Sequence, residues 1–126
     1  MSVSSSIDWN MALEQVRGDQ GFLKEILGDL MKESTEASER ILEGMRTRQF
    51  VMVMKAAHQV KGSASYLYCT DLQKCASKLQ DLGNEGTNCA EDQRHLVWTQ
   101  IENEYQNMTA YVQLLNEAIN RQFNVF

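Results

Sequence analysis

Near its C-terminal end the chain carries an apolar stripe that suits a long helix with partners along one side. Apolar residues recur there at steps of three and four: Val97, Ile101, Tyr105, Met108, Val112, Leu115 and Ile119. Such alternating steps average about 3.5 residues, the spacing that keeps a seam facing neighbouring helices. The stretch therefore predicts a core helix of a helical bundle.

Two aspartates mark the starts of the first two predicted helices. Asp8 can cap a short helix through about Val16, which Gly18 ends. Asp19 can cap a second, long helix to about Met45, because apolar pairs recur there at the helical period. These pairs are Phe22/Leu23, Ile26/Leu27, Leu30/Met31 and Ile41/Leu42.

Capping signals also delimit the last two predicted helices. Thr70 with Gln73 has the form of a capping box for a fourth helix. Its apolar stripe is Leu72, Cys75 or Ala76, Leu79 and Leu82. Residues 83–88 contain two glycines and two asparagines, which predict a loop. Asn88 with Glu91 predicts a second capping box at the start of the last helix.

Proline is absent from the 126 residues, and β-branched residues form no alternating runs. Both features favour an all-helical chain, since proline usually marks loops and strand edges. We therefore expect an all-α fold, an antiparallel four-helix bundle with a short additional N-terminal helix covering one end. A chain of this length fits one domain. We assign a frayed leader to residues 1–6 and a single domain to residues 7–122.

The net charge and the cysteines indicate which partners and which cellular compartment suit the protein. The formal net charge of -5 argues against nucleic acid or an anionic membrane as partner, because both require basic patches. No apolar run is long enough to cross a bilayer. Cys69, Cys75 and Cys89 form no C-x-x-C pair, which favours a reducing compartment. We expect a cytoplasmic monomer, also nuclear if the source is eukaryotic, with no metal or cofactor of its own.

The third predicted helix, from Phe50 to Thr70, places a histidine opposite its apolar stripe. The stripe consists of Phe50, Val53, Ala57, Val60, Ala64 and Leu67. His58 falls on roughly the opposite side, so its imidazole should face water. Gly62 follows one turn later, although glycine inside a helix costs about 1 kcal/mol relative to alanine. Because helical side chains lean toward the N-terminus, this glycine leaves the ring of His58 open to a large partner.

Lys61 follows His58 at i+3 and brings a cation near the imidazole. An open imidazole with a nearby ammonium suits a nucleophile that accepts and holds a phosphoryl group. The run His58, Val60, Lys61, Gly62 and Ser63 resembles the active helix of histidine-containing phosphotransfer (HPt) domains, whose motif is roughly His-x-Leu-Lys-Gly-Ser.

The resemblance covers most of positions 7 to 119, loosely outside the motif. It includes Asp8-Trp9, Gly18-Asp19 and Phe22-Leu23 at the family's opening helix and turn, and Leu79-Gln80 with Gly83 near the end of its fourth helix. One position differs from the family pattern. Many members have a glycine ten residues after the histidine, where this chain has Tyr68.

This resemblance implies a phosphorelay intermediate. His58 would accept a phosphoryl group from a receiver-domain aspartate and pass it to another receiver domain. The implied partners are receivers of hybrid histidine kinases and response regulators, with magnesium supplied by the receiver. Such a domain is a phosphohistidine carrier and not an enzyme, and the sequence has no ATP-binding kinase motif. Lys61 and Gly62 would serve the transfer, and Ser63 and Gln80 would belong to the phosphate environment.

Apolar residues near His58 predict a docking surface. Met54 and Val51 fall on the same expected exposed face, one and two turns before His58. Leu13 and Phe22, at the neighbouring helix starts, could extend this patch, although core packing would also explain them. Exposed apolar clusters beside a reactive residue commonly mark partner sites.

Two other functions fit the sequence less closely. The chain could be a helical adaptor that docks receiver-like partners without phosphotransfer, with His58 incidental. It could also be a redox-responsive or metal-responsive protein that uses its cysteines and histidines. His95 and the cysteines lack the spacing of zinc ligands, and His95 has the pattern of a solvated surface residue.

Overall fold

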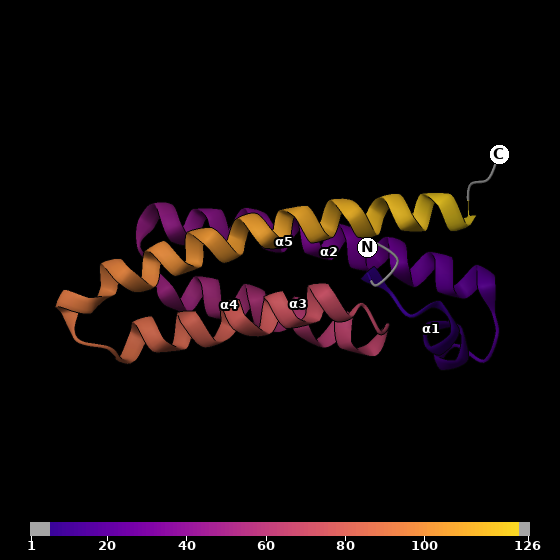
Figure 1. Cartoon of the computed structure of the whole chain (residues 1–126), viewed down its shortest axis with the longest axis horizontal. Coiled ribbons are helices and arrows are strands. Elements are labelled where there is room, and N and C mark those ends of the chain that lie inside the picture. Colours follow the sequence, from indigo (N-terminus) through magenta and orange to yellow (C-terminus); the bar gives the residue numbers. More distant parts are fainter. Residues whose placement is uncertain (1–5, 124–126) are drawn as a thin grey trace.

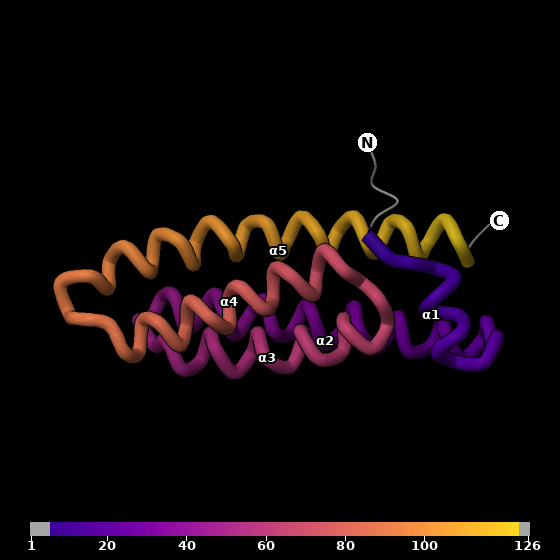
Figure 2. Tube along the Cα trace, turned by 60° about the horizontal axis from the view of Figure 1, so that its bottom comes forward, coloured from indigo at the N-terminus to yellow at the C-terminus, as the bar shows by residue number. Residues whose placement is uncertain are grey.

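The computed structural model describes residues 6–123 and shows an antiparallel four-helix bundle with a short helix at one end (Figure 1). The elements are α1 (Trp9–Gln15), α2 (Gln20–Thr47), α3 (Phe50–Tyr66), α4 (Thr70–Asn88), the 3-10 turn η2 (Glu91–Gln93) and α5 (Arg94–Phe123). Helices α2 and α5 extend past α3 and α4 at the end where α1 lies (Figure 2). The predicted fold class is confirmed. Residues 1–5 of the predicted leader lie outside the described residues, and Ser6 is buried.

The predicted apolar stripes form the core of the bundle. Every stripe residue of α3 and α4 is buried, and in α5 only Tyr105 and Val112 are half-buried. The apolar pairs at the start of α2 divide between two faces: Leu23 is buried, whereas Phe22 is exposed. None of the helices within the described part of the chain is apolar enough over its length to cross a bilayer.

Helix α1 is tied to the end of the bundle by polar and aromatic contacts. Asp8 caps α1 as predicted, its Oδ1 accepting from the amide of Met11 at 3.1 Å. The Asp8 amide donates to the carbonyl of Tyr68 at 3.1 Å, in the turn between α3 and α4. The Trp9 ring meets Phe123 of α5 edge-on, with centroids 5.8 Å apart. The short helix therefore holds together the α3–α4 turn and the end of α5.

Within residues 6–123, three residues other than glycine take the left-handed conformation at helix C-termini. They are Arg17, Arg48 and Tyr68, with φ of 57°, 59° and 59°. At the end of α3 the amide of Cys69 donates to the carbonyl of Ala64 at 2.9 Å, which is the long bond of a Schellman motif. This motif ends α3 at Tyr66, before the predicted Thr70.

The predicted capping box at Thr70 is wrong. Helix α4 begins at Thr70 itself, with Cys69 as N-cap and no side-chain hydrogen bond. The turn between α3 and α4 is so short that Cys69 both closes α3 through its amide and starts α4 through its carbonyl, which accepts from Gln73 at 2.9 Å. No position remains for a threonine cap.

The predicted loop at residues 83–88 is also wrong, because α4 continues through Asn88. Gly83 and Gly86 are buried and face α3. A Cβ on Gly83 would lie 3.0 Å from the amide nitrogen of Met54, and one on Gly86 would overlap the ring of Phe50. These glycines permit a close approach of two helices and do not form a turn.

The second predicted capping box, at Asn88 and Glu91, is wrong for the same reason. Asn88 is the last residue of α4, and its side-chain amide donates to the carbonyl of Asn84 at 2.9 Å. The chain enters α5 through η2, whose N-cap Ala90 forms no side-chain cap. The true loop is therefore shorter than predicted and lies at residues 89–90.

Candidate functional site

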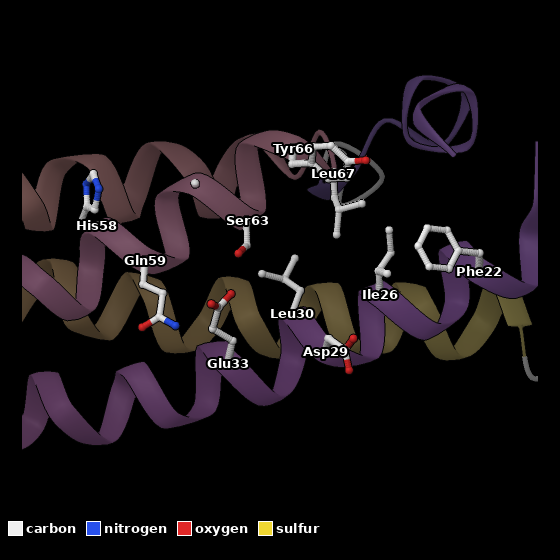
Figure 3. Close-up of a pocket in the computed structure, with 11 residues that line it drawn as sticks. Phe22, Ile26, Asp29, Leu30, Glu33, His58, Gln59, Ser63, Tyr66 and Leu67 are labelled. Atoms are coloured by element: carbon white, nitrogen blue, oxygen red, sulfur yellow. The ribbon is translucent and has the colours of Figure 1, made fainter. Parts of the chain in front are cut away.

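Helices α2 and α3 border a groove of about 640 Å³ with His58 at one end and Phe22 at the other (Figure 3). We call it the histidine groove. It is lined by Phe22, Ile26, Asp29, Leu30, Glu33, His58, Gln59, Gly62, Ser63, Tyr66 and Leu67. The first half of α2 supplies one wall and the second half of α3 the other.

His58 is exposed, as the periodicity predicts, because the buried stripe of α3 lies on the other side of the helix. In Figure 3 its imidazole points away from α2, whereas Gln59 points toward α2. Gly62 is exposed one turn later, and a Cβ built there would meet nothing within 4 Å. The space beside the imidazole is therefore open to solvent, and no packing constraint within the described residues requires a glycine at this position.

The other predicted phosphate-site residues differ in burial and in whether they line the groove. Ser63 is half-buried and lines the histidine groove, whereas Lys61 is half-buried and lines no described groove. Gln80 belongs to α4 and is half-buried. Its side-chain oxygen is buried without a hydrogen-bond partner, so the structure contains no bond from it to His58. This buried acceptor has unused capacity for a donor.

The four predicted docking residues separate in the structure. Phe22 is 46% exposed and lines the histidine groove with His58. Val51 is exposed in a neighbouring groove, and Leu13 is half-buried against the core. The expected exposure of Met54 is wrong: it is half-buried, because α3 approaches α4 closely at Gly83. The structure thus places Phe22 and His58 on the lining of one groove, at its opposite ends, but not the whole set.

A model of the Hpt domain family matches residues 25–121, which include both walls of the histidine groove except for Phe22. The chain belongs to the Hpt domain family. Hpt domains act in phosphorelays by histidine phosphotransfer and are carriers, not kinases. Comparison with curated proteins found no significant match. The resemblance based on the His58 motif is confirmed at the level of the family.

Sequence patterns alone did not single out several groove residues of this Hpt domain. Asp29, Glu33, Gln59 and Tyr66 line the groove, and Tyr66 is 53% exposed. Asp29 and Glu33 are four residues apart on α2, and Gln59 and Tyr66 are seven apart on α3, so each pair falls on one face of its helix. This spacing was a usable signal. It identifies a groove only because α2 and α3 lie side by side in the fold.

The cysteines of the Hpt domain are mainly packing residues. Cys69 and Cys75 are buried, and all three cysteines are free thiols. Burial raises the pKa of Cys69 to about 12. Burial, with a smaller contribution from Glu104, also raises the pKa of Cys75 well above its usual range. Because the thiolate is the reactive form, these two thiols are poorly suited to redox chemistry in the folded protein.

Metal-ligating side chains do not gather in the described part of the Hpt domain. Within residues 6–123, no group of three or more His, Cys, Asp and Glu side chains could hold a metal ion. His95 lies on α5 and lines a separate groove with Arg48 and Trp98, so it is not brought near His58 by that groove. The ring of Trp98 is instead covered by the Arg48 guanidinium, 5.2 Å from the ring centroid.

Proposed function

We propose that this Hpt domain is a phosphorelay intermediate that accepts a phosphoryl group on His58 from a receiver-domain aspartate and passes it to a second receiver. The observation that carries this proposal is the open space beside the imidazole. His58 is exposed, and a Cβ built on Gly62, one turn later, would meet no atom within 4 Å. An exposed imidazole with this clearance can reach a phosphorus atom inside a partner's active site.

The chemistry requires a neutral imidazole with its proton on Nδ1 and a lone pair on Nε2. Nε2 of His58 attacks the phosphorus of the receiver's aspartyl phosphate. The N–P bond forms while the bond from phosphorus to the carboxylate oxygen breaks, and the carboxylate leaves with the electron pair. The phosphorylated ring then releases its Nδ1 proton or holds it by a hydrogen bond. Attack by a second receiver's carboxylate reverses these steps.

Three neighbouring residues would support the phosphorylated state. The Lys61 ammonium, three residues after His58, would offset part of the negative charge of the phosphoryl group. The Ser63 hydroxyl lines the histidine groove and can donate a hydrogen bond. The unpaired oxygen of Gln80 could accept the Nδ1 proton of the imidazole in a side-chain rotamer that reaches the ring. That bond would hold the tautomer whose Nε2 is free to react.

The partners proposed are receivers of a hybrid histidine kinase and of a response regulator. The apolar floor of the histidine groove, including Phe22 and Ile26, would bury against such a receiver. The receiver would bring the magnesium ion that neutralises the transferring phosphoryl group. The Hpt domain itself would contribute the nucleophile and its surroundings, and no nucleotide site.

The test is phosphotransfer from a panel of radiolabelled phospho-receivers to the wild-type protein, His58→Gln and His95→Gln. We expect acid-labile, alkali-stable label on the wild type and on His95→Gln, and none on His58→Gln. Circular dichroism should show that His58→Gln keeps its helices, because the position is exposed. Label that persists in His58→Gln would overturn the assignment. Receiver binding without label on any protein would favour the adaptor function.

A further inference from the structure

A second groove continues the histidine groove along α2 and α3 toward the opposite end of the bundle. It has a volume of about 430 Å³ and is lined by Arg40, Gln49, Val51, Met52, Lys55, Ala56 and Gln59. We call it the basic groove. Gln59 lines both grooves, and its Oε1 accepts from Nη1 of Arg40 at 3.5 Å. The two grooves therefore meet beside His58.

The charge of this continuous surface changes sign where the grooves meet. The histidine groove carries Asp29 and Glu33, and its lining contains no lysine or arginine. The basic groove carries Arg40 and Lys55, and its lining contains no aspartate or glutamate. Figure 3 shows the Glu33 carboxylate pointing from α2 toward α3, on the side of Ser63.

These four charges have no oppositely charged partner of their own within the described residues. The ion pairs there join Arg46 to Glu43 and Lys78 to Glu104. Asp29, Arg40 and Lys55 are exposed, and Glu33 is half-buried. The surface therefore presents an acidic half and a basic half, whose four side chains form no ion pair within the described residues, to any partner that covers His58.

We infer, relying on the proposed function, that this charge reversal selects receivers and sets their orientation over His58. The selected receiver would place basic residues over Asp29 and Glu33, and acidic residues over Arg40 and Lys55. A receiver turned by half a revolution about His58 would face like charges at both ends. Like-charge contacts across an interface suppress wrong partners and wrong orientations.

The apolar and charged residues of the surface then have separate tasks. Phe22 and Ile26 provide apolar surface that any receiver of suitable shape can bury. The charges lie at the rim, where they act mainly on the rate of encounter and on the choice of partner. Because exposed charges are screened by ions, the selectivity should weaken as salt concentration rises.

The experiment compares Glu33→Lys and Lys55→Glu with two controls of the same charge change. Glu36→Lys on α2 and Lys74→Glu on α4 are exposed and line neither groove. The receiver that transfers fastest to the wild type is used at low and at high salt. We expect transfer and association to slow by about tenfold for each groove variant at low salt, and by much less for each control. High salt should reduce these differences.

A charge-swapped receiver provides the second measurement. Reversing the receiver residue that faces position 33 should restore transfer to Glu33→Lys and impair transfer to the wild type. Equal effects of Glu33→Lys and Glu36→Lys, or no recovery with any swapped receiver, would overturn the inference. Phosphoramidate, which phosphorylates histidine directly, should label all these variants alike.

Failure of the proposed function remains distinguishable from failure of this inference. If neither phosphoramidate nor any phospho-receiver labels His58, the phosphotransfer proposal fails. In that case, calorimetry can still measure how tightly the same variants bind the original and the charge-swapped receivers. These affinities test whether the groove charges orient a bound receiver. The inference stands if only the groove variants lose affinity and falls if the controls lose as much.

Discussion

Gly86 of α4 lies directly against the aromatic ring of Phe50 at the start of α3, with no room for a Cβ between them. The indole of Trp98 stacks on the same ring, with centroids 4.0 Å apart and planes 13° apart. The ring is thus enclosed between α4 and α5 and cannot easily move aside. This contact sets how closely α3, the helix that carries His58, approaches α4.

The first prediction concerns this contact. Gly86→Ala should destabilise the protein by about 1–3 kcal/mol, because overpacking strain exceeds the gain in helix propensity. Gly28→Ala on α2 is the matched control, since a Cβ there would meet nothing within 4 Å. It should stabilise the protein by up to about 1 kcal/mol. Guanidinium unfolding followed by circular dichroism measures both, and equal effects of the two substitutions would contradict the packing role.

Local periodicity was sufficient to predict the helices, whereas it could not predict their contacts. The stripe from Phe50 to Leu67 is set by residues on one helix, so the sequence contains its whole signal. The role that the sequence pattern predicts for Gly83 and Gly86 differs from the role that they have in the structure. A glycine pair beside asparagines favours a loop, and only the neighbouring Phe50 shows that it serves close helix packing.

The candidate site was predictable in part for the same reason. His58, Gly62 and Ser63 are near neighbours on one helix, and they line one groove. Asp29 and Glu33 join them only through the pairing of α2 with α3, which depends on the tertiary fold. A sequence pattern along α2 cannot state which of its faces meets α3.

The second prediction concerns the open space at Gly62. Gly62→Gln should stabilise the helix by up to about 1 kcal/mol, because glutamine has the higher propensity and the site is unobstructed. Phosphoryl transfer from a receiver should nevertheless fall sharply, because the long side chain would lie over the imidazole. Gly28→Gln should give a similar stabilisation with unchanged transfer. Unaltered transfer in folded Gly62→Gln would show that the glycine is incidental.

The third prediction concerns Tyr68, where many members of the family have glycine. Its φ of 59° shows that the backbone keeps the conformation that glycine adopts without steric cost. Tyr68→Gly and Tyr68→Ala both remove the ring. The difference between their unfolding free energies therefore measures the cost of the left-handed backbone at position 68. The glycine variant should be more stable by about 1 kcal/mol. Equal unfolding free energies would mean that this turn changes its conformation in one of the variants.

The fourth prediction is a pH dependence. Burial raises the pKa of Cys69 from 9.0 to about 12, so the folded protein keeps a thiol proton that the unfolded chain loses. This contribution to stability is complete below about pH 9 and decreases as the pH rises toward 12. Cys69→Ala should therefore give a shallower fall of the unfolding free energy with pH above 9. Slopes, not absolute values, are compared, because the substitution also changes packing. If wild type and Cys69→Ala lost stability equally steeply above pH 9, the raised pKa of Cys69 would not be the cause of the fall.

The last prediction concerns Lys61, which is half-buried on α3 three residues after His58. Its ammonium should stabilise the negative charge of phospho-His58 by about 1 kcal/mol, close to a factor of ten in equilibrium. Lys61→Ala should slow acceptance of the phosphoryl group and shorten the lifetime of the phosphohistidine, without abolishing either. Lys61→Arg should recover part of the loss, because it keeps the charge but presents it on a planar fork.

Two time courses measure these effects, one of transfer from a phosphorylated receiver and one of decay of the isolated phosphoprotein. Lys55→Ala serves as the control for decay, since it removes an exposed cation one turn before His58 on the basic-groove side. Its phosphohistidine should decay at the wild-type rate even if receiver binding weakens. If Lys61→Ala matches the wild type in both time courses, Lys61 has no part in the site. If both variants decay faster to the same extent, the effect reflects general charge near the helix and not the position of Lys61.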